Sequence, residues 1–208
     1  MTDRPRLIIG ISGASGVIYG VRLLEILKDL HVETHLTVSK AAEMTLAYET
    51  DKSAKDLSAL ADKRYAPGDM GAAISSGSFP CLGMVIAPCS VKSMSEIATG
   101  VTSTLLTRAA DVTLKERRPL VLMVRETPLH TGHLRSMTAL SEMGAIIAPP
   151  VPAFYTRPET VQDIVDQSVG RVLDLFGLDA AVTRRWGEDI ATGKNRPAAA
   201  QKGPRDDA

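Results

Sequence analysis

The sequence is poor in cysteine and in aromatic residues, and it carries no excess of either charge. Two of its 208 residues are cysteine, and aromatic residues make up 4%. Two cysteines without paired-motif spacing argue against a disulfide framework and suit a reducing compartment, so we expect a cytoplasmic protein. Lysine plus arginine equals aspartate plus glutamate, at 24 each, which removes any global electrostatic reason to expect nucleic acid or an anionic membrane as a partner.

Long apolar runs are also missing. No uninterrupted apolar stretch approaches the roughly 18 residues that a membrane-spanning helix needs, so none is expected. Residues 1–5 lead straight into a strand-like run, which predicts no signal peptide. The 44% of hydrophobic residues suffices for one α/β core, expected as a single domain over residues 1–190. Residues 191–208, rich in Ala, Lys, Pro and Asp, are expected to form a disordered tail.

An apolar run, a turn rich in glycine and serine, and a helical pattern open the chain. Residues 6–11 are typical of a buried strand, and residues 12–16 of a turn. Apolar residues then recur at helical spacing, at Val17, Val21, Leu24 and Leu27. Free backbone N–H groups at such a helix start, together with the hydroxyl of Ser15, would bind a phosphate, although a tight turn that binds nothing is the alternative. The spacing matches neither G-x-G-x-x-G nor a Walker loop, because Ser12 and Val17 stand at the decisive positions.

Strand-like and helix-like segments alternate along the rest of the chain. The further strands are expected at residues 34–38, 83–87, 120–124 and 145–147. Helices are expected at residues 40–48, 91–98, 103–116, 130–143 and 158–176. This alternation predicts an α/β fold, a Rossmann-like (flavodoxin-like) doubly wound parallel sheet flanked by helices.

Hydroxyl, cationic and acidic side chains follow several of the expected strands. They lie at residues 12–15, 39–40, 89–93 and 125–126. Ligands of doubly wound sheets bind beyond the carboxyl ends of the strands, so these residues predict an anion-binding crevice at that edge. Taken singly, Ser39 and Ser90 could be helix caps. Arg125 and Glu126 could be a phosphate ligand and a proton-transfer acid, or a surface ion pair.

Two further charged groups lie outside those strand ends. Arg108 and Lys115 share a helix face about two turns apart, and a solvated basic helix end is the favoured interpretation from these residues alone. Glu49 stands where a helix ends. A carboxylate there is unfavourable with the helix dipole, which indicates a task other than capping that helix.

Residues near the C-terminus combine aromatic rings with cations. Tyr155 follows a stiff turn of prolines, with Arg171 and Trp186 further along. Such a set suits a phosphate clamp with an apolar wall, although ordinary core packing is the alternative. His130 and His133 have no third ligand nearby, so no metal site is expected.

Taken together, these motifs resemble the UbiX-type flavin prenyltransferases. The resemblance lies in residues 10–16, 38–42, 48–51, 74–78, 87–90, 108–120, 124–130, 152–155 and 185–186, and covers nearly the whole chain to about residue 187. It implies an enzyme that binds reduced FMN and transfers a dimethylallyl group from dimethylallyl monophosphate to flavin N5 and C6, without a metal. The prenylated FMN would serve a UbiD-type decarboxylase, in ubiquinone synthesis or aromatic acid breakdown. Homo-oligomers, commonly dodecamers, are typical of such proteins.

The resemblance also assigns roles by position. The residues that would bind FMN are Gly13, Ala14, Ser15, Ser39, Ser90, Val91, Lys92, Ser93 and Arg125. The residues that would bind the donor are Tyr155 and Arg171, with Arg108 and Lys115 in support across a subunit boundary and Trp186 as a wall. The proton-transfer residues would be Glu49 and Glu126, with Ser15 in the same network. Met70 stands where some relatives place a tryptophan.

Three alternatives remain to be separated from this reading. A flavin-dependent cysteine decarboxylase of the same general fold depends on asparagine and histidine, and the one asparagine here is Asn195, in the expected tail. A non-catalytic FMN carrier would need neither the basic clamp nor the acids. Direct decarboxylation of an aromatic acid would need no prenyl phosphate, so analysis of the product would identify it.

Overall fold

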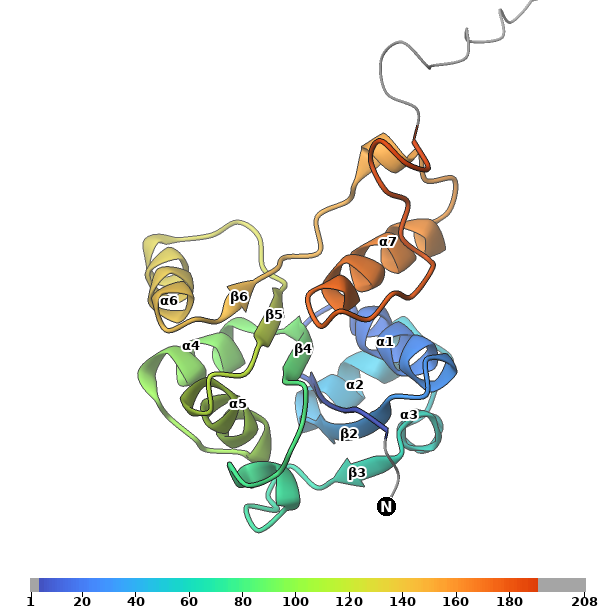
Figure 1. Cartoon of the computed structure of the whole chain (residues 1–208). Helices are drawn as coiled ribbons and strands as arrows, with labels where there is room; N and C mark the ends of the chain where they lie inside the picture. The colour runs from blue at the N-terminus through green and yellow to red at the C-terminus, as the bar shows by residue number, and fades with distance from the viewer. Residues whose placement is uncertain (1–3, 191–208) are drawn as a thin grey trace, which may run out of the picture.

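The computed structural model describes residues 4–190, which are built around one parallel sheet (Figure 1). Its six strands stand in the order β3-β2-β1-β4-β5-β6. The strands are β1 (Arg6–Ile11), β2 (Glu33–Val38), β3 (Lys63–Tyr65), β4 (Met84–Cys89), β5 (Leu120–Val124) and β6 (Ile146–Ile147). Every adjacent pair is parallel, which confirms the expected doubly wound fold. The order reverses direction between β1 and β4, so this is where such a sheet opens a crevice at its carboxyl edge.

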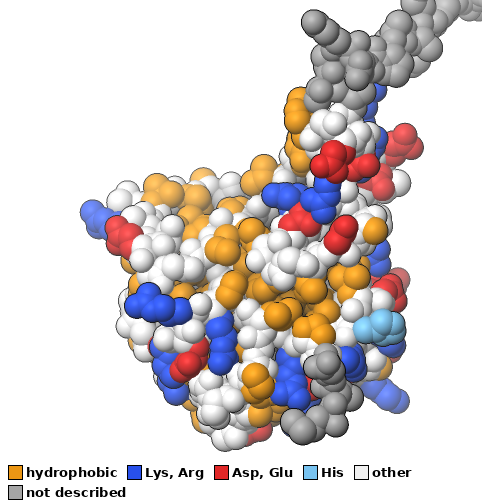
Figure 2. Space-filling model, in the orientation of Figure 1, with side chains coloured by type: hydrophobic (Ala, Val, Ile, Leu, Met, Phe, Trp, Pro, Cys, Tyr) orange, Lys and Arg blue, Asp and Glu red, His pale blue; other side chains and the backbone are white. Residues whose placement is uncertain are grey.

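Helices cover both faces of the sheet. They are α1 (Val17–Asp29), α2 (Lys40–Glu49), α3 (Ala54–Leu60), α4 (Val91–Thr99), α5 (Leu105–Lys115), α6 (Thr131–Glu142) and α7 (Val161–Asp174), with short 3-10 turns η1 (Ala73–Ser75) and η2 (Phe154–Thr156). One hydrophobic core joins the sheet to α1, α2, α3 and α7, and a second joins it to α4, α5 and α6. Beyond α7 in Figure 1, η2 and the last described residues project from the body, and the space-filling view in Figure 2 shows both basic and acidic side chains on this projection.

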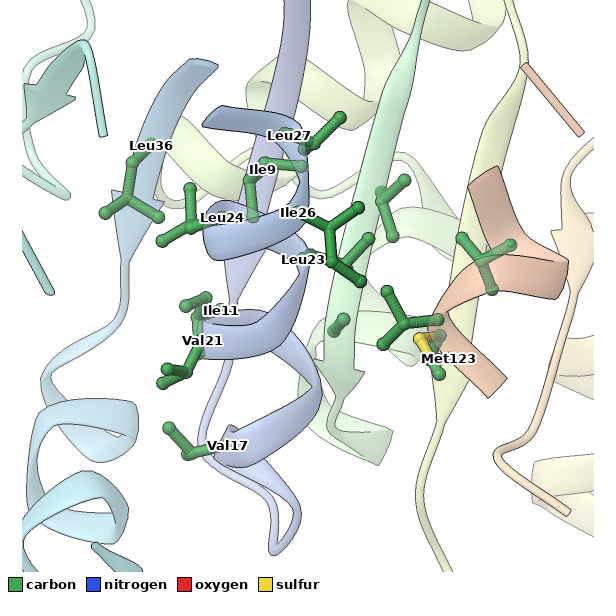
Figure 3. Packing of buried hydrophobic residues seen from close by; sticks show 14 of the residues in the cluster. Ile9, Ile11, Val17, Val21, Leu23, Leu24, Ile26, Leu27, Leu36 and Met123 are labelled. Atoms are coloured by element: carbon green, nitrogen blue, oxygen red, sulfur yellow. The ribbon is translucent and has the colours of Figure 1, made fainter. Parts of the chain in front are cut away.

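The central strand β1 supplies both cores, as a strand with two covered faces must. Leu7, Ile9 and Ile11 belong to the core beneath α1, whereas Ile8 belongs to the core beneath α4 and α5. On α1 the predicted helical stripe is confirmed and is fully buried (Figure 3), at Val17, Val21, Leu24 and Leu27. The fixed start of α1 places the turn after β1 at the carboxyl edge of the sheet.

Several boundaries differ from the expectations. Neither α3 nor β3 was expected, because both are short and mostly polar, and β3 buries only Tyr65. Strand β4 continues through Pro88 to Cys89, with an irregular register against β5 after Ile86. Helix α7 begins at Val161, because the Thr160 side chain accepts a hydrogen bond from the Asp163 N–H and so caps the helix. The expected tail at 191–208 lies outside the described residues.

None of the helices within residues 4–190 has the length and hydropathy of a membrane-spanning segment. In that same range, no cluster of three or more histidine, cysteine, aspartate or glutamate side chains is arranged to hold a metal ion.

Candidate functional site

The turn after β1 is tied to the turn after β4 through Ser12. The Ser12 hydroxyl donates to the Pro88 carbonyl at 2.9 Å and accepts from the Ser90 N–H at 2.7 Å. The Ser12 N–H also donates to the Pro88 carbonyl, at 3.2 Å. Ser12 is fully buried, so these bonds are shielded from water. The two turns that flank the switch point of the sheet are therefore held as one unit.

Glu49 caps α1 rather than its own helix. The N–H groups of Gly16 and Val17 donate to its Oε2 atom at 2.8 and 3.1 Å. A carboxylate at the positive end of α1 is stabilised by the helix dipole, which accounts for an acid at the unfavourable end of α2. The sequence predicted a ligand phosphate at this helix start, and the structure differs, because Glu49 occupies these two N–H groups. Ser15 lies exposed beside this contact.

A cavity of about 470 Å³ lies at the carboxyl edge, and we call it the Ser39–Ser90 cavity. Its lining comprises Gly13, Ser39, Lys40, Ala41, Pro67, Gly68, Ser90, Val91, Lys92, Ser93, Glu96, Ser103, Thr104 and Leu106. The N-termini of α2, α4 and α5 all contribute to it. Ser39 accepts from the Ala42 N–H at 3.1 Å, and Ser90 accepts from the Ser93 N–H at 3.3 Å. Helix N-termini with free hydroxyl and N–H donors bind anions.

Six of the nine residues predicted to bind the cofactor line this cavity. They are Gly13, Ser39, Ser90, Val91, Lys92 and Ser93. Gly13 allows a close approach of α2, since a Cβ at this position would lie 2.3 Å from the Cβ of Ala41. The apolar part of the wall, which includes Pro67, Val91 and Leu106, suits a flat ring system.

Sequence reasoning missed several residues of this lining. Pro67 and Gly68 come from the loop after β3, a strand that was itself not expected. Ser103 and Thr104 precede α5, and the capping box between Thr104 and Thr107 was the available signal. Glu96 accepts from Lys92 at 2.8 Å and from Ser103 at 3.1 Å, so its charge inside the lining is neutralised.

Arg125 and Glu126 leave β5 between the exits of β4 and β6. The Arg125 N–H donates to the Cys89 carbonyl at 3.1 Å, and the Arg125 side chain is exposed. Glu126 accepts from the Thr127 N–H at 3.0 Å and is partly exposed. Both side chains therefore stand at the carboxyl edge without a fixed ion-pair partner among the described residues, which leaves them available to a ligand.

A second, smaller cavity of about 230 Å³ lies between the exit of β6 and α7, and we call it the Arg171 cavity. Its lining comprises Met123, Ala148, Pro149, Pro150, Val151, Ala153, Gln167, Ser168, Arg171, Val172 and Leu175. Arg171 is the charged residue of this mostly apolar lining. Nearby, the Tyr155 and Trp186 rings meet edge to face with centroids 5.5 Å apart. A guanidinium beside an apolar hollow suits a small apolar group that carries a phosphate.

Arg108 and Lys115 do not join either cavity within one chain. Arg108 donates to the Asp111 carboxylate at 2.7 Å and to the Ser75 carbonyl at 3.3 Å, and Lys115 pairs with Glu116. Lys115 is the last of the 11 residues of α5, so about 15 Å of helix separates it from the first turn, which lines the Ser39–Ser90 cavity. Lys115 therefore lies away from the cavity, whereas Arg108 lies close to it in sequence but bonds to Ser75 and Asp111 and does not belong to the lining.

The cysteine nearest the site is not a nucleophile. Cys89 is fully buried beside Ser90, and burial raises the pKa of its thiol to about 12. Burial also raises the pKa of Cys81, although the Arg118 guanidinium works in the opposite direction. Both thiols stay protonated near neutral pH, which leaves acids and hydroxyls as the reactive groups at this edge.

Comparison with known proteins shows which family this chain resembles. The family model for flavoproteins matches residues 1–173. Flavin prenyltransferase UbiX of Escherichia coli K12 is 62% identical over 174 residues, which are 83% of this chain and 92% of that protein. The crystal structure of AnUbiX (PadA1) in complex with FMN and dimethylallyl pyrophosphate has a TM-score of 0.87 at 49% identity and covers 88% of this chain and 97% of that chain. The dodecameric FMN-dependent UbiX-like decarboxylase from Escherichia coli O157:H7 has a TM-score of 0.85 at 53% identity and covers 87% of this chain and 98% of that chain.

Proposed function

The chain belongs to the flavoprotein family and, within it, to the UbiX-type flavin prenyltransferases, and we propose that the Ser39–Ser90 cavity and the Arg171 cavity bind the two substrates of that reaction. Membership confirms the enzyme class predicted from the sequence. The protein transfers a dimethylallyl group from a dimethylallyl phosphate to N5 and C6 of reduced FMN, and prenylated FMN is the product. The donor proposed here is the monophosphate.

The Ser39–Ser90 cavity is proposed as the FMN site. The observation that carries this assignment is the shape and lining of the cavity. Its size, apolar walls and converging helix N-termini fit a flat ring system that ends in a phosphate. The phosphate would bind at the starts of α2 and α4, through Ser39 and residues 90–93. The turn at residues 13–15 and the Arg125 guanidinium would hold the remaining polar edge of the flavin. Bound reduced FMN supplies a nucleophilic nitrogen, N5, and the ring carbon C6.

The Arg171 cavity is proposed as the donor site. The allylic C–O bond breaks with its electron pair leaving on the phosphate, so the residues around that phosphate must stabilise negative charge. Arg171 and the hydroxyl of Tyr155 would do so, with Trp186 covering the apolar chain and excluding water. Arg108 and Lys115 would reach the phosphate from a neighbouring copy, and the place of Lys115 at the far end of α5 from the Ser39–Ser90 cavity supports this.

Glu49, Glu126 and Ser15 are proposed to move protons. Closing the ring at C6 adds a proton to the prenyl double bond and removes the proton of C6, so a carboxylic acid that delivers a proton and a carboxylate that accepts one must be within reach. Glu126 lies at the exit of β5, between the strand exits that carry the two cavities. Glu49 is held at the start of α1 beside Ser15, so its carboxylate has a fixed position from which to exchange a proton through that hydroxyl.

Assembly, partner and compartment complete the proposal. We propose a homo-oligomer, a dodecamer like the similar UbiX-like protein of Escherichia coli O157:H7, in which Arg108 and Lys115 of one copy would supplement the donor phosphate site of another. Prenylated FMN would pass to a UbiD-type decarboxylase, for which family membership is the support.

Two free cysteines support a reducing compartment, the cytoplasm. Residues 1–190 are proposed as the flavoprotein domain, with residues 191–208 as a tail.

The deciding experiment mixes the protein anaerobically with reduced FMN and dimethylallyl monophosphate and follows the flavin by mass spectrometry. A mass gain of C5H8 is expected, with the diphosphate reacting less well. Glu126→Gln is expected to retain FMN and to lose the gain. Bound FMN without any gain, from either donor, would contradict prenyl transfer and leave a flavin carrier. Carbon dioxide released from an aromatic acid without a prenyl phosphate would instead show direct decarboxylation.

A further inference from the structure

Asp174, the last residue of α7, binds two arginines from different segments. Arg171 Nη1 donates to Asp174 Oδ2 at 2.5 Å. Arg185 approaches from the other side and makes two bonds, Nη1 to Oδ2 at 3.1 Å and Nη2 to Oδ1 at 3.0 Å. A two-pronged arginine–carboxylate contact is the strong and geometrically specific form of this interaction. Asp174 is thus the common acceptor for both guanidinium groups.

This cluster differs from an ordinary surface ion pair. The side chain of Asp174 is 16% exposed, whereas that of Arg171 is 57% exposed. Partial burial works to raise the pKa of Asp174, but the hydrogen bonds and charge of Arg185, and then those of Arg171, outweigh it and lower the pKa. Asp174 therefore stays ionised near neutral pH, while the side chain of Arg171, which it binds, remains exposed.

Both arginines lead to residues assigned to the donor site. Arg171 lines the Arg171 cavity. Arg185 directly precedes Trp186, whose ring meets Tyr155 edge to face. The segment that carries Arg185 and Trp186 is also fixed to α7, because the side chain of Gln167 accepts a hydrogen bond from the Arg184 N–H at 2.9 Å. One carboxylate therefore connects α7 to the last described segment, and through Trp186 to Tyr155 on η2.

We propose that Asp174 is a positioning residue for the prenyl donor: it holds Arg171 at the mouth of its cavity and, through Arg185, keeps Trp186 against Tyr155. The inference rests on the proposed function of that cavity. Asp174 does not contact the donor itself.

The test compares Asp174→Asn with wild-type protein in the prenyl-transfer assay. Loss of a charged hydrogen-bond partner should raise the KM for dimethylallyl monophosphate roughly tenfold, with FMN affinity unchanged. Trp186 is the one tryptophan of the chain, so its fluorescence reports directly on this segment. Its emission should shift in Asp174→Asn, because the ring, 63% exposed, loses its contact with Tyr155. Asp174→Glu, which keeps the charge, should recover most of the donor KM.

Asp179→Asn is the matched control. Asp179 also lies near Arg185, at 3.5 Å, but its side chain is 76% exposed and does not touch Arg171. Its donor KM and Trp186 emission should stay at the wild-type values. If Asp174→Asn proves unstable, Arg185→Gln breaks the Trp186 branch alone and should still shift the emission and raise the donor KM.

The outcomes separate the two levels of the argument. Wild-type prenylation with an unchanged donor KM in Asp174→Asn overturns the positioning role only. A fall in FMN affinity as large as the rise in donor KM also overturns it, because the residue would then be generally structural. Absence of prenylation by the wild-type protein overturns the proposed function, and with it the donor that Asp174 is inferred to serve.

Discussion

The carboxylate of Glu49 lies 2.8 Å from the backbone nitrogen of Gly16, across 33 positions of sequence. Through this bond the end of α2 supplies the capping group that the start of α1 lacks, since Gly16 itself has no side chain to cap the helix. A negative charge at the positive end of a helix is stabilising, and here it also fixes a residue assigned to proton transfer.

Glu49→Gln should therefore weaken the fold as well as the reaction. The amide keeps an acceptor oxygen but loses the charge, so the free energy of unfolding should fall by about 1 kcal/mol. Urea titration at neutral pH measures this change. Asp51→Asn is the control, because Asp51 is exposed nearby and takes no part in the contact. An equal loss in both variants would point to general surface charge and contradict the cap.

Gly13→Ala should disturb the Ser39–Ser90 cavity. The new Cβ would lie 2.3 Å from the Cβ of Ala41, so α2 must shift, at a cost of about 1–3 kcal/mol typical of overpacking. FMN affinity, followed by flavin fluorescence, should fall because Ser39 moves with α2. Gly71→Ala is the control, since the nearest atom to its Cβ is 3.6 Å away. Wild-type affinity in Gly13→Ala would show that the start of α2 does not bind the flavin.

His35 should make the fold sensitive to mild acid. It is buried and bonded to Tyr65 and Glu33 at 2.9 Å each. Burial lowers the pKa of His35 below its usual value of 6.5, although Glu33 works in the opposite direction. The unfolded chain therefore binds more protons than the folded chain as the pH falls below 6.5, and the free energy of unfolding drops.

Substitution isolates this contribution. Between about pH 7 and about pH 5.5, the free energy of unfolding of His35→Gln should fall less steeply than that of wild type, by at most about 1.4 kcal/mol per pH unit. His31→Gln serves as the control, because His31 is exposed. Parallel curves for wild type and His35→Gln, measured by denaturant titration, would rule out the buried imidazole as the source.

The two cysteines should differ in reactivity toward a thiol reagent. With a pKa of about 12, the thiol of Cys89 is ionised in only about one molecule in ten thousand at pH 8, and it is fully buried. In the native protein, the reagent should therefore react slowly with at most one thiol per chain, that of Cys81. Denaturant should expose both. Native Cys81→Ser should be inert, and prompt labelling of that variant would contradict the burial of Cys89.

Hydrophobic spacing was sufficient to predict the strands and helices with continuous apolar faces. Strand β1 and helix α1 were predicted because their buried residues recur at the periods of a strand and a helix. Helix α3 and strand β3 were not, because the edge of the sheet buries little of them and leaves no such pattern. The residues after the strand ends could be assigned to one edge, since that follows from parallel topology alone.

The partners of individual site residues could not be predicted in this way. The sequence showed that Glu49 was misplaced on its own helix, but the identity of the helix it caps depends on a contact between distant segments. The separation of Lys115 from the cavity likewise follows from the direction of α5 in space. Asp174 gave only a local signal, its spacing of three residues from Arg171 on α7, because Arg185 reaches it only when α7 and residues 182–190 fold together.

The bonds of Ser12 have a consequence for anyone who redesigns this scaffold. Because its hydroxyl joins Pro88 to Ser90, the segment after β4 cannot be exchanged for that of another protein without also choosing the residue at position 12. A grafted loop whose backbone carbonyl and N–H do not lie opposite the Ser12 hydroxyl would leave that buried hydroxyl without a partner. These positions form one exchangeable module, and libraries that vary them together should yield more folded variants than libraries that vary them one at a time.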